Sequence, residues 1–91
     1  MKYSEMLSLA ITQSGLKLSK IAEMVGNITG TQPTTQYLSR LQNGANPPGA
    51  DKLNDALSQV LGIDALELKV AAYREKIPQD VLEKLQSDPK K

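Results

Sequence analysis

The residues best suited to chemistry in this sequence are polar side chains within one short segment, residues 34–44. Gln36 and Arg40 are four residues apart, so on a helix they lie one turn apart on the same face. Glutamine can form two hydrogen bonds with adenine, and arginine two with guanine, in the major groove of DNA. The spacing therefore suits the recognition of base edges, although solvated polar residues on any amphipathic surface helix give the same pattern.

Catalysis has few candidate residues. The 91 residues include no cysteine and no histidine, which excludes disulfides, zinc sites built from those side chains and nucleophiles activated by histidine. Asp51 and Asp55 are spaced as paired catalytic carboxylates on a helix, but no nucleophile or metal-binding set accompanies them. We therefore expect a solvated helix face at these residues, no enzyme activity and no cofactor.

The segment 34–44 carries the signals of a short helix. Thr34 is a good N-cap because its hydroxyl can accept a hydrogen bond from an amide two or three residues later, and Pro33 prevents extension backwards. Leu38 and Leu41 share one side of such a helix and predict its buried face. Glycine at position 44 offers a left-handed residue that ends the helix. A helix is thus expected to present its polar side to a ligand.

Apolar residues at helical spacing, together with capping signals, predict helices on both sides of this segment. The expected elements are a first helix over residues 3–13, a second over 18–26, a loop over 26–33, a fourth helix over 51–61, a fifth over 65–76 and a sixth after residue 78. This is an all-α, compact fold of five to six helices, in which residues 1–76 form the domain and residues 77–91 add the short sixth helix and a polar tail.

The charge balance gives little attraction for nucleic acid, because the formal net charge is only +1. Residues 1–52 hold five Lys/Arg and three Asp/Glu, whereas residues 53–91 hold six and seven, so the excess of positive charge is in the first part. Lys17 and Lys20 flank the start of the second helix, whose free amides suit a phosphate; solvated surface lysines are an equal alternative. No leader or membrane-spanning pattern is evident, so we expect a cytoplasmic protein with no membrane partner.

Three segments taken together resemble a known family: SGLKLSKIAEMVG, TTQYLSRLQNG and LNDALSQVLGID. Over about residues 6–68 the chain resembles the lambda-repressor-like helix-turn-helix family of the Cro/C1 type. The resemblance implies a domain that puts its third helix, here residues 35–42, into the major groove of double-stranded DNA, usually as a dimer and usually to regulate transcription. The connector before Thr34 is longer than the family's tight turn and resembles a long-turn branch of it.

Carried over by position, the resemblance implies two groups of contact residues. The positions that match base-contacting sites are Thr35, Gln36 and Arg40, with Tyr37 beside them. The positions that match backbone-contacting sites are Thr34, Asn43 and Asn46, to which we add Lys17 and Lys20. For Tyr37, partial burial against the core is an equal alternative.

Beyond the matching segment, Val81, Leu82 and Leu85 form an apolar strip. Either the fifth helix or a second subunit must cover such a strip, and we expect it to help form a homodimer on a palindromic operator. The sequence thus predicts a transcriptional regulator, of the kind that phages and mobile elements use as repressors. The alternative is that the same scaffold binds a regulatory protein, as an antitoxin or an accessory of another regulator.

Overall fold

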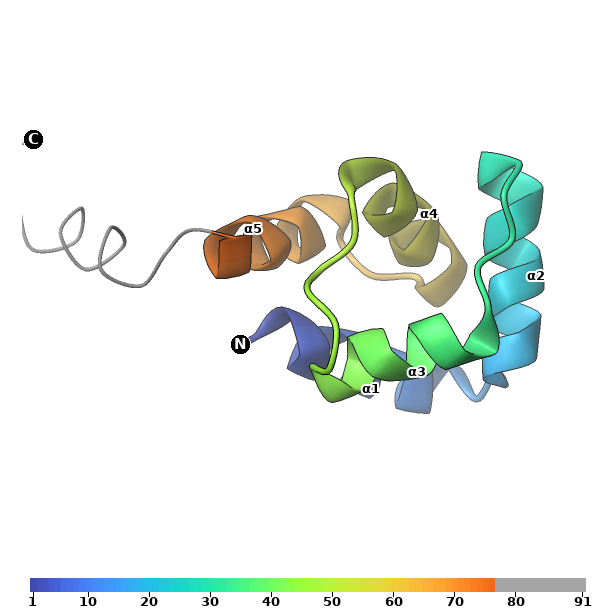
Figure 1. The fold of residues 1–91 in the computed structure, drawn as a ribbon, viewed down its shortest axis with the longest axis horizontal. Coiled ribbons are helices and arrows are strands. Elements are labelled where there is room, and N and C mark those ends of the chain that lie inside the picture. The colour runs from blue at the N-terminus through green and yellow to red at the C-terminus, as the bar shows by residue number, and fades with distance from the viewer. Residues whose placement is uncertain (77–91) are drawn as a thin grey trace, which may run out of the picture.

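The computed structural model describes residues 1–76, and over that range it contains five α-helices and no strand (Figure 1). The helices are α1 (Tyr3–Ser14), α2 (Leu18–Thr29), α3 (Thr35–Asn43), α4 (Asp51–Leu61) and α5 (Ala65–Lys76). The expected all-α fold is confirmed. The sixth helix expected after residue 78, and with it the strip of Val81, Leu82 and Leu85, lies outside the described residues.

All five helices contribute to one core. Helix α1 packs against α3, α4 and α5, and α2 packs against α3 and α4. The buried apolar side chains are Tyr3, Leu7, Ile11, Ile21, Ala22, Val25, Leu38, Leu41, Ala56, Leu57, Leu68, Ala71 and Ala72. Among them, Leu38 and Leu41 of α3 lie on the face that the helical spacing predicted to be buried. No helix among residues 1–76 has the length and apolar character that crossing a bilayer requires.

Two linked, buried hydrogen bonds cross this core. The Tyr3 hydroxyl donates a hydrogen bond to Oδ1 of Asn54 at 2.7 Å, and Nδ2 of Asn54 donates to the Gly49 carbonyl at 2.9 Å. Burial raises the pKa of Tyr3 to about 12, so this hydroxyl keeps its proton at neutral pH. Because a buried polar group without a partner is costly, these bonds fix α1 against the segment that joins α3 to α4.

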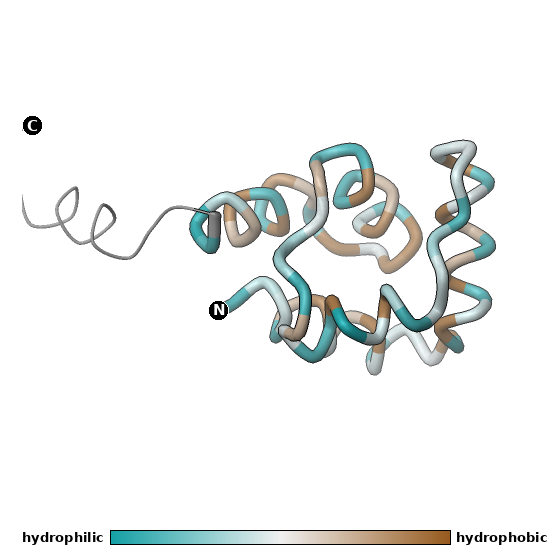
Figure 2. The backbone as a smooth tube through the Cα atoms, in the orientation of Figure 1, coloured by the Kyte–Doolittle hydropathy of each residue, from teal (hydrophilic) through white to brown (hydrophobic). Residues whose placement is uncertain are grey.

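The second helix is longer than predicted. We expected it to end near Gly26 with a loop over residues 26–33, but α2 continues to Thr29 and ends at Gly30, whose φ of 85° is left-handed. A Cβ atom at Gly26 would lie 2.8 Å from the Cβ of Gln32, so the glycine makes room for the returning chain rather than ending the helix. The connector over residues 30–34 runs back beside α2 to the start of α3 (Figure 1). It is pale to teal in Figure 2, without a strongly hydrophobic stretch.

Candidate nucleic-acid interface

Helix α3 is held at both ends by the residues that the sequence indicated. Oγ1 of Thr34 accepts a hydrogen bond from the Tyr37 amide at 3.0 Å. At the other end Gly44 takes a φ of 77°, and its amide donates to the Leu41 carbonyl at 3.3 Å. Such caps each stabilise a helix by about 1 kcal/mol. The nine residues of α3 therefore have fixed directions for their side chains.

The two sides of α3 differ as expected. Leu38 and Leu41 are completely buried, and each residue is 0% exposed to solvent. Gln36, Arg40 and Asn43 are exposed on the opposite side. Thr35 is exposed at the first turn of the same helix. The structure therefore brings most of the predicted base-contacting side chains together on one solvent-facing surface, which we call the α3 face (Thr35, Gln36, Arg40 and Asn43).

The α3 face carries positive charge and no acidic residue. Arg40 is the one charged residue between Met24 and Ala50 in the sequence, so neither α3 nor its two connectors contains a carboxylate. Among residues 1–76 the Arg40 guanidinium makes no ion pair. An arginine without an acidic partner is available for a bidentate contact with a base or a phosphate.

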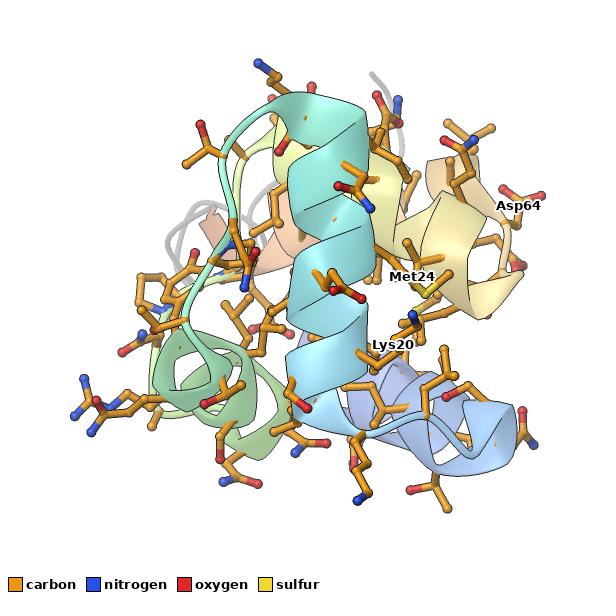
Figure 3. The ribbon with its side chains drawn as sticks, turned by 90° about the vertical axis from the view of Figure 1, so that its right-hand side faces the viewer. Lys20, Met24 and Asp64 are labelled. Atoms are coloured by element: carbon orange, nitrogen blue, oxygen red, sulfur yellow. The ribbon has the colours of Figure 1, made fainter. Side chains whose placement is uncertain are left out.

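The two lysines of α2 lie in different surroundings. Lys17 is the exposed N-cap residue of α2, where no side chain caps the helix amides. Nζ of Lys20 lies 3.0 Å from Oε1 of Glu23. Figure 3 shows Lys20 with Met24 on the side of α2 that faces α4, whereas α3 lies on the other side, and the labelled Asp64 sits farther out at the start of α5. Lys20 thus lies on the side of α2 away from α3.

The remaining predicted residues lie at the edges of the α3 face. Asn46 is half-buried, and its backbone amide donates a hydrogen bond to the Arg40 carbonyl at 3.4 Å, which keeps the residue close to the end of α3. Tyr37 is half-buried and packs against the core. This partial burial is one of the two alternatives stated for Tyr37, and Thr34, the N-cap, is exposed.

One of the two acidic residues of α4 makes a surface ion pair. Oδ1 of Asp55 lies 2.9 Å from Nζ of Lys69, and this hydrogen bond raises the pKa of the lysine. Asp51 is exposed in the first turn of the same helix. Over residues 1–76 no group of three carboxylates is gathered in a way that could hold a metal ion.

Helix α5 carries an exposed apolar stripe that was not predicted from the sequence. Leu66, Val70 and Tyr73 are 69%, 44% and 68% exposed, although the same helix buries Leu68 and Ala71 on its other side. The signal was present as spacings of four and three residues between the exposed members, which place them on one face. We call these three residues the α5 stripe. Met1, which is 78% exposed, lies with Leu66 and Val70 around a surface groove of about 530 Å³.

Comparisons of this chain with protein-family models, with curated proteins and with solved structures found no match. The α3 face, the α2 N-terminus and the α5 stripe are therefore the features of the molecule that bear on its function.

Proposed function

We propose that this domain is a sequence-specific regulator of transcription that acts in the cytoplasm and binds double-stranded DNA through α3. The observation that carries the proposal is the α3 face: exposed Gln36 and Arg40 one turn apart on a helix whose other side is completely buried. A helix about 10–12 Å in diameter fits a major groove about 12 Å wide. A helix with such side chains suits the reading of base edges in the major groove.

In this proposal the side chains divide between bases and backbone. Gln36 and Arg40 contact base edges, with Thr35 at the tip of the helix. Lys17 contacts a phosphate together with the uncapped amides of α2, since a helix N-terminus favours an anion. The polar side chains that bound α3, Thr34 and Asn43, position the helix on the sugar-phosphate backbone, as does Asn46 beyond its end.

We further propose that the working unit is a homodimer on a palindromic operator. A single small domain buries only about 600–1,000 Å² on DNA, and the net charge of +1 adds little general affinity. Two copies related by a two-fold axis would bind half-sites about 34 Å apart or a multiple of that distance. The α5 stripe supports the pairing, because exposed apolar residues grouped on one helix face suit contact with another protein.

The test begins with selection of bound sequences from a random pool of duplex DNA. We expect a palindromic motif with an adenine or guanine at the positions that Gln36 and Arg40 contact. Binding to that motif should weaken linearly on a logarithmic salt scale, with a slope of about −0.9 for each neutralised phosphate. Enrichment of no motif, together with binding that salt does not affect, would refute the proposal.

Lys17→Ala and Lys20→Ala make a matched pair for the same titration. In a dimer, loss of Lys17 should flatten the salt slope by about 2, because one phosphate contact disappears from each subunit. Lys20→Ala should leave the slope unchanged, since that lysine pairs with Glu23 on the α4 side of α2. Equal slopes for both variants and the wild type would remove the α2 N-terminus from the interface.

A second candidate function is a protein-binding module, such as an antitoxin or an accessory of another regulator. The α5 stripe is the observation that favours it, since a partner protein could cover this face as well as a second copy could. The two functions differ in their response to substitution. In a protein-only module, Arg40→Ala leaves partner affinity unchanged and no DNA sequence is enriched, whereas Val70→Glu abolishes partner binding.

A further inference from the structure

A groove of about 500 Å³ lies between the connector that precedes α3 and the first turn of α4. Its wall on the α3 side includes Pro33, Thr34 and Tyr37, and its wall on the α4 side includes Ala50 and Leu53. Sites for small molecules in proteins commonly measure about 300–1,000 Å³ and are mostly apolar with a few polar groups. The groove has this size and this character.

Two glycines allow the walls to stand where they do. A Cβ at Gly26 would come within 2.8 Å of the Cβ of Gln32, so the connector can lie against α2 only because that atom is missing. A Cβ at Gly49 would come within 2.6 Å of Leu53 and 3.5 Å of the Tyr37 hydroxyl. Leu53 and Tyr37 therefore approach the same stretch of backbone. The groove is thus a product of close packing on both sides.

The lining has one charged group. Lys52 is among the residues that line the groove, and no acidic residue is. Within residues 1–76 Lys52 makes no ion pair, whereas Lys20 and Lys69 each have an acidic partner. A negatively charged group placed near Lys52 would meet an uncompensated positive charge, while the rest of the molecule would lie on Tyr37, Pro33 and Leu53.

We propose that this groove binds a small carboxylate with a flat apolar body, the apolar part against Tyr37 and Leu53 and the carboxylate toward Lys52. Complementary charge and an apolar floor together favour such a molecule over a neutral or cationic one. The occupant would touch Thr34 and Tyr37, which are the N-cap and the first turn of α3. On the basis of the proposed DNA-binding function, it would then change the affinity of α3 for DNA.

The binding experiment uses 2-naphthoate as the probe and neutral 2-naphthamide as its matched control, followed by amide NMR shifts of the full chain. We expect saturable shifts at Thr34, Tyr37 and Leu53. Lys52→Gln should weaken 2-naphthoate about two- to fivefold, the value of an exposed ion pair, and should leave 2-naphthamide unchanged. Lys20→Gln, on the opposite flank of α2, should alter neither affinity.

Ala50→Phe should fill the groove and abolish binding of both probes, because Ala50 lies in its wall and is itself exposed. If Ala50→Phe melts at a lower temperature than the wild type, Thr31→Trp is used instead to fill the groove from the connector side. Shifts centred on the α5 stripe, no saturation by about 10 mM, or equal effects of Lys52→Gln on acid and amide would each overturn the assignment.

The regulatory consequence needs a separate measurement, the affinity of the chain for its selected duplex with and without saturating 2-naphthoate. A change of about twofold or more that Ala50→Phe removes would support coupling between the groove and α3. An unchanged affinity with the probe bound would overturn the coupling. Absence of any selected duplex would refute the proposed DNA-binding function alone, because the NMR titration does not involve DNA.

Discussion

Arg40 and Leu41 are adjacent in sequence, but on α3 the first is exposed and the second is buried, so replacing each by alanine in turn tests the orientation of the helix. Leu41 is 0% exposed and packs within the core. Truncating a buried leucine costs about 2–5 kcal/mol, from lost burial and from the cavity that remains. In a domain of this size, 1 kcal/mol changes the melting temperature by about 4–8 °C, so Leu41→Ala should lower it by at least about 8 °C.

Arg40→Ala should have the opposite profile. The side chain is exposed and has no ion-pair partner among residues 1–76, so the free energy of unfolding should change by less than about 0.5 kcal/mol. A bidentate base contact is worth about 1–3 kcal/mol, so affinity for the selected duplex should fall about 5- to 150-fold. The loss on random duplex should be much smaller.

Thermal melting by circular dichroism and a binding titration on selected and random duplexes decide between these expectations. Both variants are measured at the same salt concentration, because affinity for DNA depends on it. If Leu41→Ala kept the wild-type melting temperature and lost DNA binding, the helix faces would be assigned the wrong way round. Equal losses on the two duplexes for Arg40→Ala would make the arginine a phosphate contact.

Three further predictions concern the core, the specificity and the dimer. Tyr3→Phe leaves the buried Asn54 without its hydrogen-bond donor and should lower the free energy of unfolding by about 1–3 kcal/mol. Because the pKa of Tyr3 is raised from 10.0 to about 12, the contribution of its hydroxyl to stability is complete below pH 10 and is lost as the pH rises toward 12. The free energies of unfolding of wild type and variant, measured in denaturant melts, should therefore converge over that interval. Gln36→Ala should relax the preference at one base pair, whereas Asn43→Ala should weaken binding to all DNA sequences alike. If the selection is repeated with Gln36→Ala and returns the wild-type motif, the assignment of Gln36 to a base contact is contradicted. Val70→Glu should sediment as a folded monomer with weakened operator binding if the α5 stripe forms the dimer; a monomer from Leu82→Glu alone would instead assign the interface to residues after 76.

The parts of the fold that the sequence predicted depend on short-range contacts. Thr34 caps α3 through an amide only three residues away. Helix spacing identifies Leu38 and Leu41 as buried without knowledge of what covers them. Features that require only a few neighbouring residues can be recognised in one sequence.

Other features depend on partners that are distant in the chain. The Tyr3 hydroxyl and Asn54 are 51 positions apart, and neither residue type indicates a buried pair. On α5, residues with apolar side chains occupy both the buried and the exposed face, so spacing alone could not tell which face the core takes. Only the packed arrangement of α1 and α4 against α5 makes Leu66 an exposed residue and Leu68 a buried one.

Helix α2 extends beyond Gly26 because this glycine makes room for the connector and does not end the helix. From Gly26 to Thr29 the helix advances about 4.5 Å at 1.5 Å per residue, and the five connector residues 30–34 can span about 16 Å when extended. The connector is thus long enough to reverse direction and return along α2, with Gln32 against Gly26, before Thr34 starts α3. Additional residues between α2 and α3 therefore need not displace α3 from the core, where Leu38 and Leu41 hold it. Instead they form the outer wall of the groove beside Tyr37, which links the length of this connector to the ligand site that we propose.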